Sequence, residues 1–165
     1  MQKIYQTWNY IEKLLSGLLL FSSVIIVLYA VFMRYVMHAA PEWTEELVIY
    51  LVVWAVYIIS SLLAEERGHV GATFIVEFIP IKIRRFIEVG TGILCLFFSM
   101  MVVYYGLFFV DIALKMGEVS ASTLRFPMWI AYLAIPVGMI LFSFRIIIRL
   151  YFLIFKFSDD LIIDN

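Results

Sequence analysis

Four stretches of this sequence are long, apolar and almost free of charge, and this pattern limits the possible fold more than any other feature. They cover about residues 14–36, 47–64, 86–110 and 129–155. A helix rises about 1.5 Å per residue, so about 20 apolar residues cross a hydrocarbon layer about 30 Å thick. The stretches are continuous and do not alternate between apolar and polar residues, which excludes a membrane β-barrel. The sequence therefore predicts an all-α integral membrane protein with four transmembrane helices.

The composition agrees with a chain that is embedded in lipid. Of its 165 residues, 65% are hydrophobic and 15% are charged, whereas a soluble domain is about half apolar and a quarter charged. The 12 basic and 13 acidic residues nearly balance, so nucleic acid is not expected as a partner. The first apolar stretch is longer than the core of a signal peptide, and we expect it to remain as a membrane helix. In the absence of an internal repeat or a linker, residues 1–165 are predicted to form a single membrane domain.

The basic residues are distributed unevenly between the two sides that four spans create. Nine fall on the side with both termini and the second connection, and three fall on the other side. The nine are Lys3, Lys13, Arg67, Lys82, Arg84, Arg85, Arg145, Arg149 and Lys156, and the three are Arg34, Lys115 and Arg125. Because cytoplasmic segments carry the excess of Lys and Arg, both termini are predicted to lie in the cytoplasm.

Two segments outside the spans have apolar residues at helical spacing, a pattern typical of amphipathic helices in the membrane interface. The first covers about residues 3–13, with Trp8 on its apolar face and Glu12 on another face. The second covers about residues 68–80. Three basic residues follow it at the expected depth of the headgroups, and they are expected to contact membrane lipids: Lys82, Arg84 and Arg85. A loop without regular structure is the alternative for either segment.

Ionisable residues are scarce within the predicted spans, where each one would be a functional candidate because burying a charge is costly. Glu88 lies within a turn of Arg84 and Arg85, so we expect a local ion pair near the cytoplasmic face. Arg145 and Arg149 are expected to extend to the lipid headgroups. The serines within the spans are expected to allow close helix packing. A solute path would need several polar ligands in mid-bilayer, and the chain offers few.

The sequence shows no pattern typical of catalysis, cofactor binding or metal coordination. Its two histidines, His38 and His69, follow the first and second spans and are therefore expected to lie about 30 Å apart. Two axial ligands of one haem cannot be so distant. The single cysteine, Cys95, lies inside a span and excludes an internal disulfide. We predict no catalytic residue, no cofactor and no metal site.

The segment before the second span has two interpretations. Thr44 can cap the helix, while Glu45 and Glu46 in the first turn interact favourably with the positive end of its dipole. Alternatively, Trp43 and the two carboxylates form a contact surface for a partner, since aromatic residues beside charges are good anchors. These residues alone leave both interpretations open.

Several motifs occur in an order that resembles one known family. They are Trp43-Thr44-Glu45-Glu46 at the start of the second span, Glu66-Arg67-Gly68-His69-Val70 at its end, Ser122-Thr123-Leu124, Pro127 and Trp129, Ile135-Pro136-Val137-Gly138, and Arg145. Together they resemble the small membrane subunit (Q subunit, DctQ type) of tripartite ATP-independent periplasmic (TRAP) transporters. No single motif is specific, but their joint order extends over nearly the whole chain.

The resemblance implies a non-catalytic subunit in the bacterial inner membrane. Its expected partners are a large membrane transport subunit (M type), a periplasmic solute-binding protein and membrane lipids. The large subunit is expected to carry the sodium and substrate sites for an organic acid, such as sialic acid or a C4-dicarboxylate. The small subunit is expected to brace it and to help dock the binding protein. The residues expected to contact partners are Trp43, Glu45, Glu46, Arg67, His69, Pro127 and Trp129.

Two other functions fit a four-helix membrane chain of this length. A dimeric exporter would depend on a carboxylate embedded in the first helix, and no acidic residue occurs between Glu12 and Glu42. A membrane anchor of a respiratory enzyme is the second alternative. The positions of His38 and His69 exclude haem within the chain, which leaves a haem-free anchor.

Overall fold

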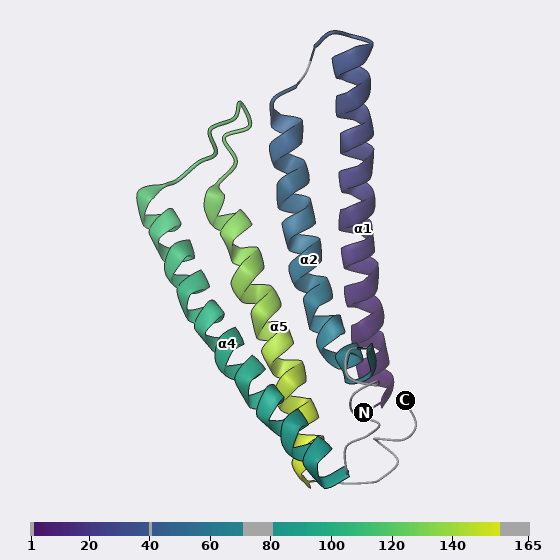
Figure 1. Ribbon diagram of the computed structural model, residues 1–165. Coiled ribbons are helices and arrows are strands. Elements are labelled where there is room, and N and C mark those ends of the chain that lie inside the picture. Colours follow the sequence, from purple (N-terminus) through teal and green to yellow (C-terminus); the bar gives the residue numbers. More distant parts are fainter. Residues whose placement is uncertain (1, 40, 71–80, 156–165) are drawn as a thin grey trace.

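The protein folds into long helices that follow the apolar stretches of the sequence (Figure 1). The computed structural model describes residues 2–39, 41–70 and 81–155. The helices are α1 (Gln2–Tyr35), α2 (Trp43–Val70), α4 (Ile81–Met116) and α5 (Met128–Phe155). Each contains a segment that is long and apolar enough to cross a membrane. The prediction of an all-α protein with four membrane helices is confirmed.

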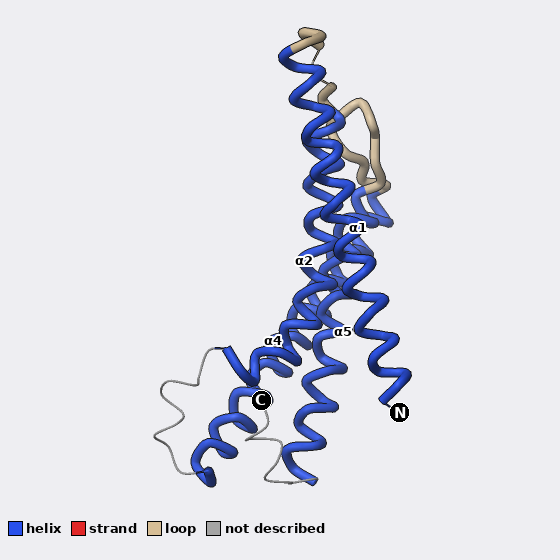
Figure 2. The backbone as a smooth tube through the Cα atoms, turned by 90° about the vertical axis from the view of Figure 1, so that its right-hand side faces the viewer, coloured by secondary structure: helices blue, strands red, loops and turns tan. Residues whose placement is uncertain are grey.

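The four helices stand side by side in a row, in the order α1, α2, α5, α4 (Figure 1). Neighbours in this row pack against each other, and α1 and α4 form its two edges. Seen after a turn of 90°, the upper part of the row is narrow, and α4 and α5 diverge from α1 below (Figure 2). We call the end with the α1–α2 and α4–α5 connections the loop end, and the opposite end the terminal end. The molecule is thus one helix layer thick.

Glycine and serine residues let the central helices approach closely. A Cβ atom on Gly138 of α5 would lie 2.6 Å from the backbone oxygen of Tyr57 in α2, so only glycine fits there. Gly106 of α4 faces the ring of Pro136 in α5 in the same way. Between the same two helices, Ser143 donates a hydrogen bond of 2.8 Å to Ser99. Small residues are the usual means by which membrane helices pack tightly.

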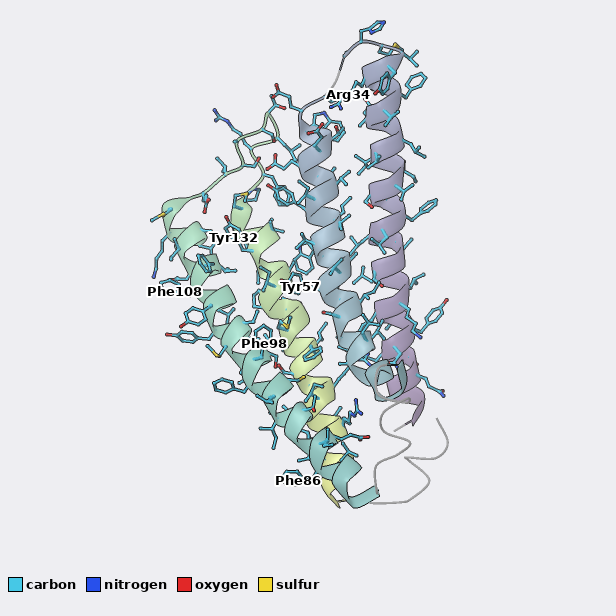
Figure 3. All side chains as sticks on the ribbon, viewed as in Figure 1. Arg34, Tyr57, Phe86, Phe98, Phe108 and Tyr132 are labelled. Carbon is cyan, nitrogen blue, oxygen red and sulfur yellow. The ribbon has the colours of Figure 1, made fainter. Side chains whose placement is uncertain are left out.

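A single layer leaves most of the apolar surface of the spans uncovered. Buried residues make up 39% of the most apolar window of α5 and 11% of that of α1. Each helix has large exposed apolar side chains along its length, such as Phe86, Phe98 and Phe108 on α4 (Figure 3). Exposed apolar area of this extent requires lipid or another protein against it.

The bounds of the helices differ from the predicted segments at the terminal end. Residues 3–13, predicted as a separate interfacial helix, continue without a break into the first span within α1. The second predicted interfacial helix, 68–80, lies mostly outside the described residues, and its first residues form the end of α2. At the loop end, α4 runs on to Met116, six residues beyond the predicted end at Val110.

Candidate functional site

The most deeply buried charges form an ion pair between α1 and α5 near the terminal end. Arg145 Nη2 lies 2.5 Å from Glu12 Oε2, and the two side chains are 3% and 6% exposed. The prediction that Arg145 extends to lipid headgroups is therefore wrong. A carboxylate on α1, the edge helix beyond α2, offers the guanidinium a closer countercharge within the protein.

Polar groups from α1 and α2 surround this ion pair. Ser61 of α2 donates a hydrogen bond of 2.9 Å to Glu12 Oε2, and the indole Nε1 of Trp8 donates one of 2.7 Å to Oε1. Asn9 Oδ1 accepts a hydrogen bond of 2.8 Å from Arg145. A buried ion pair is tolerated when such hydrogen bonds satisfy its remaining lone pairs and protons. We call Trp8, Asn9, Glu12, Ser61 and Arg145 the buried polar cluster.

Helical spacing explains how α1 supplies this cluster. Residues 9, 12 and 16 follow one another at three and four positions, so they lie on one face of the helix. Ser16 is buried and donates to the carbonyl oxygen of Glu12, 2.8 Å away. The sequence predicted residues 3–13 as an amphipathic helix in the membrane interface, whereas in the structure Asn9 and Glu12 contact α2 and α5.

A second, weaker ion pair joins α4 to α5 at the same end. Arg149 Nη2 lies 3.7 Å from Glu88 Oε2, and both side chains are partly exposed. The predicted partners of Glu88 were Arg84 and Arg85, whose side chains lie outside the described residues. The described interaction of Glu88 thus connects two helices rather than two turns of one helix.

At the loop end, Glu46 of α2 binds the α4–α5 connection. Its Oε2 accepts a hydrogen bond of 2.8 Å from Ser120, and its Oε1 accepts one from Tyr50. The hydroxyl of Tyr50 also lies 3.1 Å from Sδ of Met128 at the start of α5. The carboxylate thereby joins α2 to the connection, and Tyr50 extends the contact to α5. We call these four residues the Glu46 cluster.

The α4–α5 connection itself has a defined shape. Gly117, with φ of 60°, ends α4, and the amide of Glu118 donates to the carbonyl of Ala113, 3.0 Å away. This is a glycine-based helix cap. Beyond it, Val119 and Pro127 pair as an antiparallel bridge. The connection therefore folds back on itself before α5 begins.

An exposed ion pair fixes the other connection at the loop end. Arg34 at the end of α1 lies 2.6 Å from Glu45, and the side chains are 57% and 69% exposed. The ring centroid of Trp43 is 6.2 Å from that of Tyr29 in α1. Thr44 is a cap of α2 in one of the two interpretations of this segment; in the structure it is buried in the first turn, and its hydroxyl donates to the carbonyl of Pro41, 2.7 Å away.

The structure thus separates the predicted contact residues into two groups. Trp43, Glu45, Glu46, Pro127 and Trp129 are brought to the loop end by the starts of α2 and α5. Arg67 and His69 belong to the last turns of α2 at the terminal end, and their side chains lie outside the described residues. The same holds for the side chains of the predicted lipid contacts, Lys82, Arg84 and Arg85, in the first turns of α4.

The polar groups described above form contacts between helices and between a helix and a connection. Within the described parts of the chain, no three His, Cys, Asp or Glu side chains are placed so as to hold a metal ion. His38 is exposed beyond the loop end of α1, while residue 69 is in α2 at the terminal end. The buried polar cluster and the Glu46 cluster connect elements of the row to one another.

A multi-pass membrane protein whose polar groups bond one another, and whose apolar faces are uncovered, has the features of a subunit. The model of the family "Tripartite ATP-independent periplasmic transporters, DctQ component" matches residues 23–155. The chain belongs to this family, whose members are transporter subunits rather than enzymes. It is a multi-pass protein of the bacterial inner membrane.

The chain is similar to several proteins whose names give different substrates. The sialic acid TRAP transporter permease protein SiaT of Haemophilus influenzae is 27% identical over 84% of this chain and 22% of its own length. The C4-dicarboxylate small permease protein DctQ of Rhodobacter capsulatus is 34% identical over 62% of this chain and 45% of its own. The isethionate TRAP transporter permease protein DctMQ of Oleidesulfovibrio alaskensis is 23% identical over 81% of this chain and 22% of its own length. The chain therefore spans between about a fifth and a half of the length of these relatives.

Proposed function

We propose that the chain is the non-catalytic small membrane subunit of a sodium-coupled TRAP transporter for an organic acid. In this role it braces a large membrane subunit of the M type, which carries the sodium and substrate sites. It also helps a periplasmic solute-binding protein to dock. Family membership supports the subunit role, and the shape of the molecule supports the bracing role.

The observation that carries this proposal is the single-layer row of helices. A transport path must be enclosed by protein, and a row with two open faces encloses none of its own (Figures 1 and 2). The buried charges of the Glu12–Arg145 pair are bound to each other and to neighbouring helices, so they serve cohesion between helices. The exposed apolar faces offer a large area to a partner in the membrane.

The excess of basic residues at the terminal end favours a cytoplasmic position for that end. The loop end then faces the periplasm, where Trp43, Glu45, Glu46, Pro127 and Trp129 would help to form the docking surface for the binding protein. Arg67 and His69 would contact the large subunit on the cytoplasmic side. Lys82, Arg84 and Arg85 would lie among lipid headgroups there.

The cargo is proposed only as a class. The relatives' names include sialic acid, C4-dicarboxylate and isethionate, and all of these are organic anions. The chain's buried charges are engaged in the contacts between helices, so the residues that select among anions are assigned to the large subunit and the binding protein.

Co-purification and reconstitution test the proposal directly. The tagged chain is expressed with the genes that flank its own, extracted in mild detergent and analysed for accompanying proteins. We expect a large multi-span protein to accompany it, and sodium-dependent uptake of an organic acid by liposomes only when both subunits and the binding protein are present. Uptake by the purified chain alone would falsify the proposal.

The docking surface has its own test. Glu45→Gln removes an exposed charge at the loop end, and Asp111→Asn removes an exposed charge from α4 that is bound to Lys115. Binding of the solute-binding protein to the reconstituted complex is expected to weaken for Glu45→Gln and to stay unchanged for Asp111→Asn. Equal binding by both variants would remove Glu45 from the docking surface without affecting the subunit role.

A further inference from the structure

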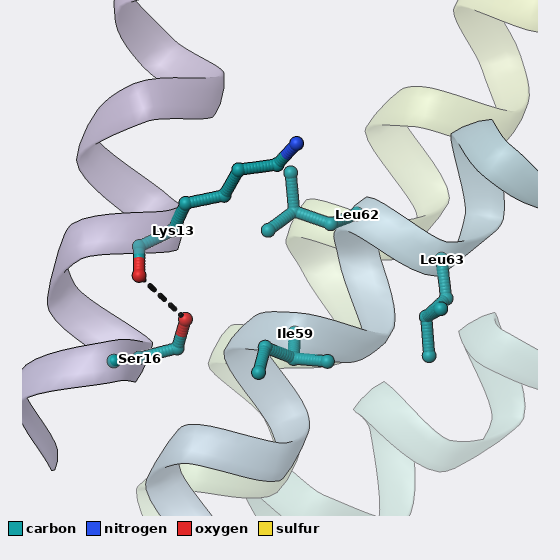
Figure 4. A pocket seen from close by; sticks show the side chains of 6 residues that line it. Lys13, Ser16, Ile59, Leu62 and Leu63 are labelled. Atoms are coloured by element: carbon teal, nitrogen blue, oxygen red, sulfur yellow. Dashed lines mark hydrogen bonds between the residues drawn. The ribbon is translucent and has the colours of Figure 1, made fainter. Parts of the chain in front are cut away.

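A groove opens between α1 and α2 near the terminal end of the row. It has a volume of about 250 Å³ and is lined by Lys13, Ser16, Gly17, Ile59, Leu62 and Leu63. In Figure 4, the side chain of Lys13 extends from α1 across the top of the groove towards Leu62 of α2. The volume is below that of a typical site for a small organic molecule, about 300–1,000 Å³, and it suits a segment of a hydrocarbon chain.

The depth of the groove in the membrane follows from the positions of the charges on α1. Lys13 and Arg34 are 21 residues apart in one continuous helix, which corresponds to about 32 Å along its axis. This length matches the hydrocarbon core of a bilayer, about 30 Å. The ammonium group of Lys13 therefore lies at the level of the phosphates, and Gly17 lies one turn deeper, in the hydrocarbon region.

The wall of the groove below Lys13 is apolar. The hydroxyl of Ser16 donates to carbonyl oxygens of its own helix, those of Glu12 at 2.8 Å and of Lys13 at 3.2 Å (Figure 4), rather than into the groove. A Cβ atom on Gly17 would meet nothing within 4 Å, so the floor beside it is open. Ile59, Leu62 and Leu63 of α2 form the opposite side. An acyl chain matches these surfaces, whereas water would find few partners for hydrogen bonds.

The rim of the groove carries a basic side chain. Lys13 is exposed, and its ammonium group extends over the groove (Figure 4). A cation at headgroup level above an apolar groove is complementary to a phospholipid whose headgroup has a net negative charge.

We propose that this groove binds one anionic phospholipid of the inner membrane. The phosphate contacts the ammonium group of Lys13, and one acyl chain lies along Gly17, Ile59 and Leu62 between α1 and α2. The site would fill the gap between the edge helix and its neighbour beside the buried polar cluster. It requires only that the chain resides in the membrane, so it stands independently of the transport role.

Native mass spectrometry of the purified protein, with whichever subunits accompany it, measures the lipid directly. Detergent micelles contain equal amounts of phosphatidylglycerol, which is anionic, and phosphatidylcholine, which is zwitterionic. We expect wild-type protein to retain phosphatidylglycerol in preference, and Lys13→Gln to lower that preference about fivefold, the effect of one basic residue near an anionic surface. Lys13→Arg keeps the charge and is expected to keep the preference.

A second pair of variants tests the groove separately from the charge. Gly17→Leu places a bulky side chain at the floor, where a Cβ atom would meet nothing within 4 Å, and is expected to reduce the retention of lipid, whereas Gly90→Leu, at another open glycine on α4, is expected to have no effect. Unchanged retention in either Lys13→Gln or Gly17→Leu would overturn the proposal. So would loss of an accompanying membrane subunit in Gly17→Leu with lipid retention unchanged, since the groove would then hold a protein helix.

Discussion

At the scale of single residues, Glu12 and Arg145 are the most deeply buried charged residues in the part of the chain that the structure describes. Glu12→Gln keeps the shape of the side chain but leaves Arg145 buried without its countercharge. Removing one partner of a buried pair typically costs about 3–5 kcal/mol, so we expect a marked loss of stability. Unfolding of the detergent-solubilised protein by heat or by SDS measures this loss.

The double variant Glu12→Gln/Arg145→Gln is the control for that measurement. Because neither charge is then buried alone, it is expected to be more stable than Arg145→Gln or Glu12→Gln. If the effects of the two single changes simply add, the two residues do not interact energetically, and the pair would have no role in holding α1 to α5.

The two carboxylates at the start of α2 are expected to differ although they are adjacent in sequence. Glu45 forms an exposed pair with Arg34, and exposed pairs contribute about 0–1 kcal/mol. Glu46 accepts hydrogen bonds from Ser120 and Tyr50, and loss of its charge should cost more than that, because the charge-assisted hydrogen bonds of both hydroxyl groups are weakened. Thermal midpoints of Glu45→Gln and Glu46→Gln measure the difference, and a lower midpoint for Glu45→Gln would contradict it.

The sequence predicted which residues are polar but not where their partners lie. Glu12 was placed off the apolar face of the predicted interfacial helix, yet spacing within one helix does not show whether a polar side chain meets lipid headgroups or a neighbouring helix. The partner, Arg145, is 133 residues away in sequence, and only the packing of α1, α2 and α5 brings it near. The role of Glu46 depends likewise on Ser120, 74 residues away.

At the scale of the helices, three glycines form a graded test of packing. A Cβ atom would meet nothing at Gly90, the side chain of Pro136 at 3.0 Å from Gly106, and the backbone of Tyr57 at 2.6 Å from Gly138. We expect Gly90→Ala to be neutral or stabilising by up to about 1 kcal/mol, because alanine favours helix. Gly138→Ala should be the most damaging, since overpacking costs about 1–3 kcal/mol or more.

The yield of monodisperse protein and its thermal midpoint measure this series. The expected order of stability is Gly90→Ala, then Gly106→Ala, then Gly138→Ala. A Gly138→Ala variant as stable as the Gly90→Ala variant would show that α2 and α5 do not approach as closely as described.

The helices themselves were well predicted because a membrane span must be long and apolar whatever it packs against. The end of the predicted interfacial segment at residue 13 was less well founded. Lys13 marks a change of polarity, but no proline or glycine there interrupts the helix, so α1 runs from Gln2 to Tyr35. The close contact at Gly138 has no signal in one sequence beyond the glycine itself.

At the scale of the whole molecule, the length of the helices determines how far the two ends of the row extend from the membrane. The apolar parts of α1 and α4 cover 30 and 31 residues, or about 45 Å each, which exceeds a hydrocarbon core of about 30 Å. Lys13 and Arg34 of α1 are 21 residues apart and match that core, so the residues of α1 beyond them reach out of the hydrocarbon region and contact water.

Single cysteines on α1 can then test both the depth and the orientation of the row. In a Cys95→Ala background, Met37→Cys and Gln6→Cys place thiols at exposed positions at opposite ends, and Ile25→Cys places one at an exposed position between them. A membrane-impermeant maleimide applied to intact cells with a permeabilised outer membrane is expected to label Met37→Cys alone. Gln6→Cys should react only after the inner membrane is opened, because the basic residues keep the terminal end in the cytoplasm. Ile25→Cys should stay unlabelled in both conditions, since lipid or a partner covers it. Labelling of Gln6→Cys in intact cells would reverse the orientation and move the proposed docking surface to the cytoplasm, where a periplasmic binding protein could not reach it.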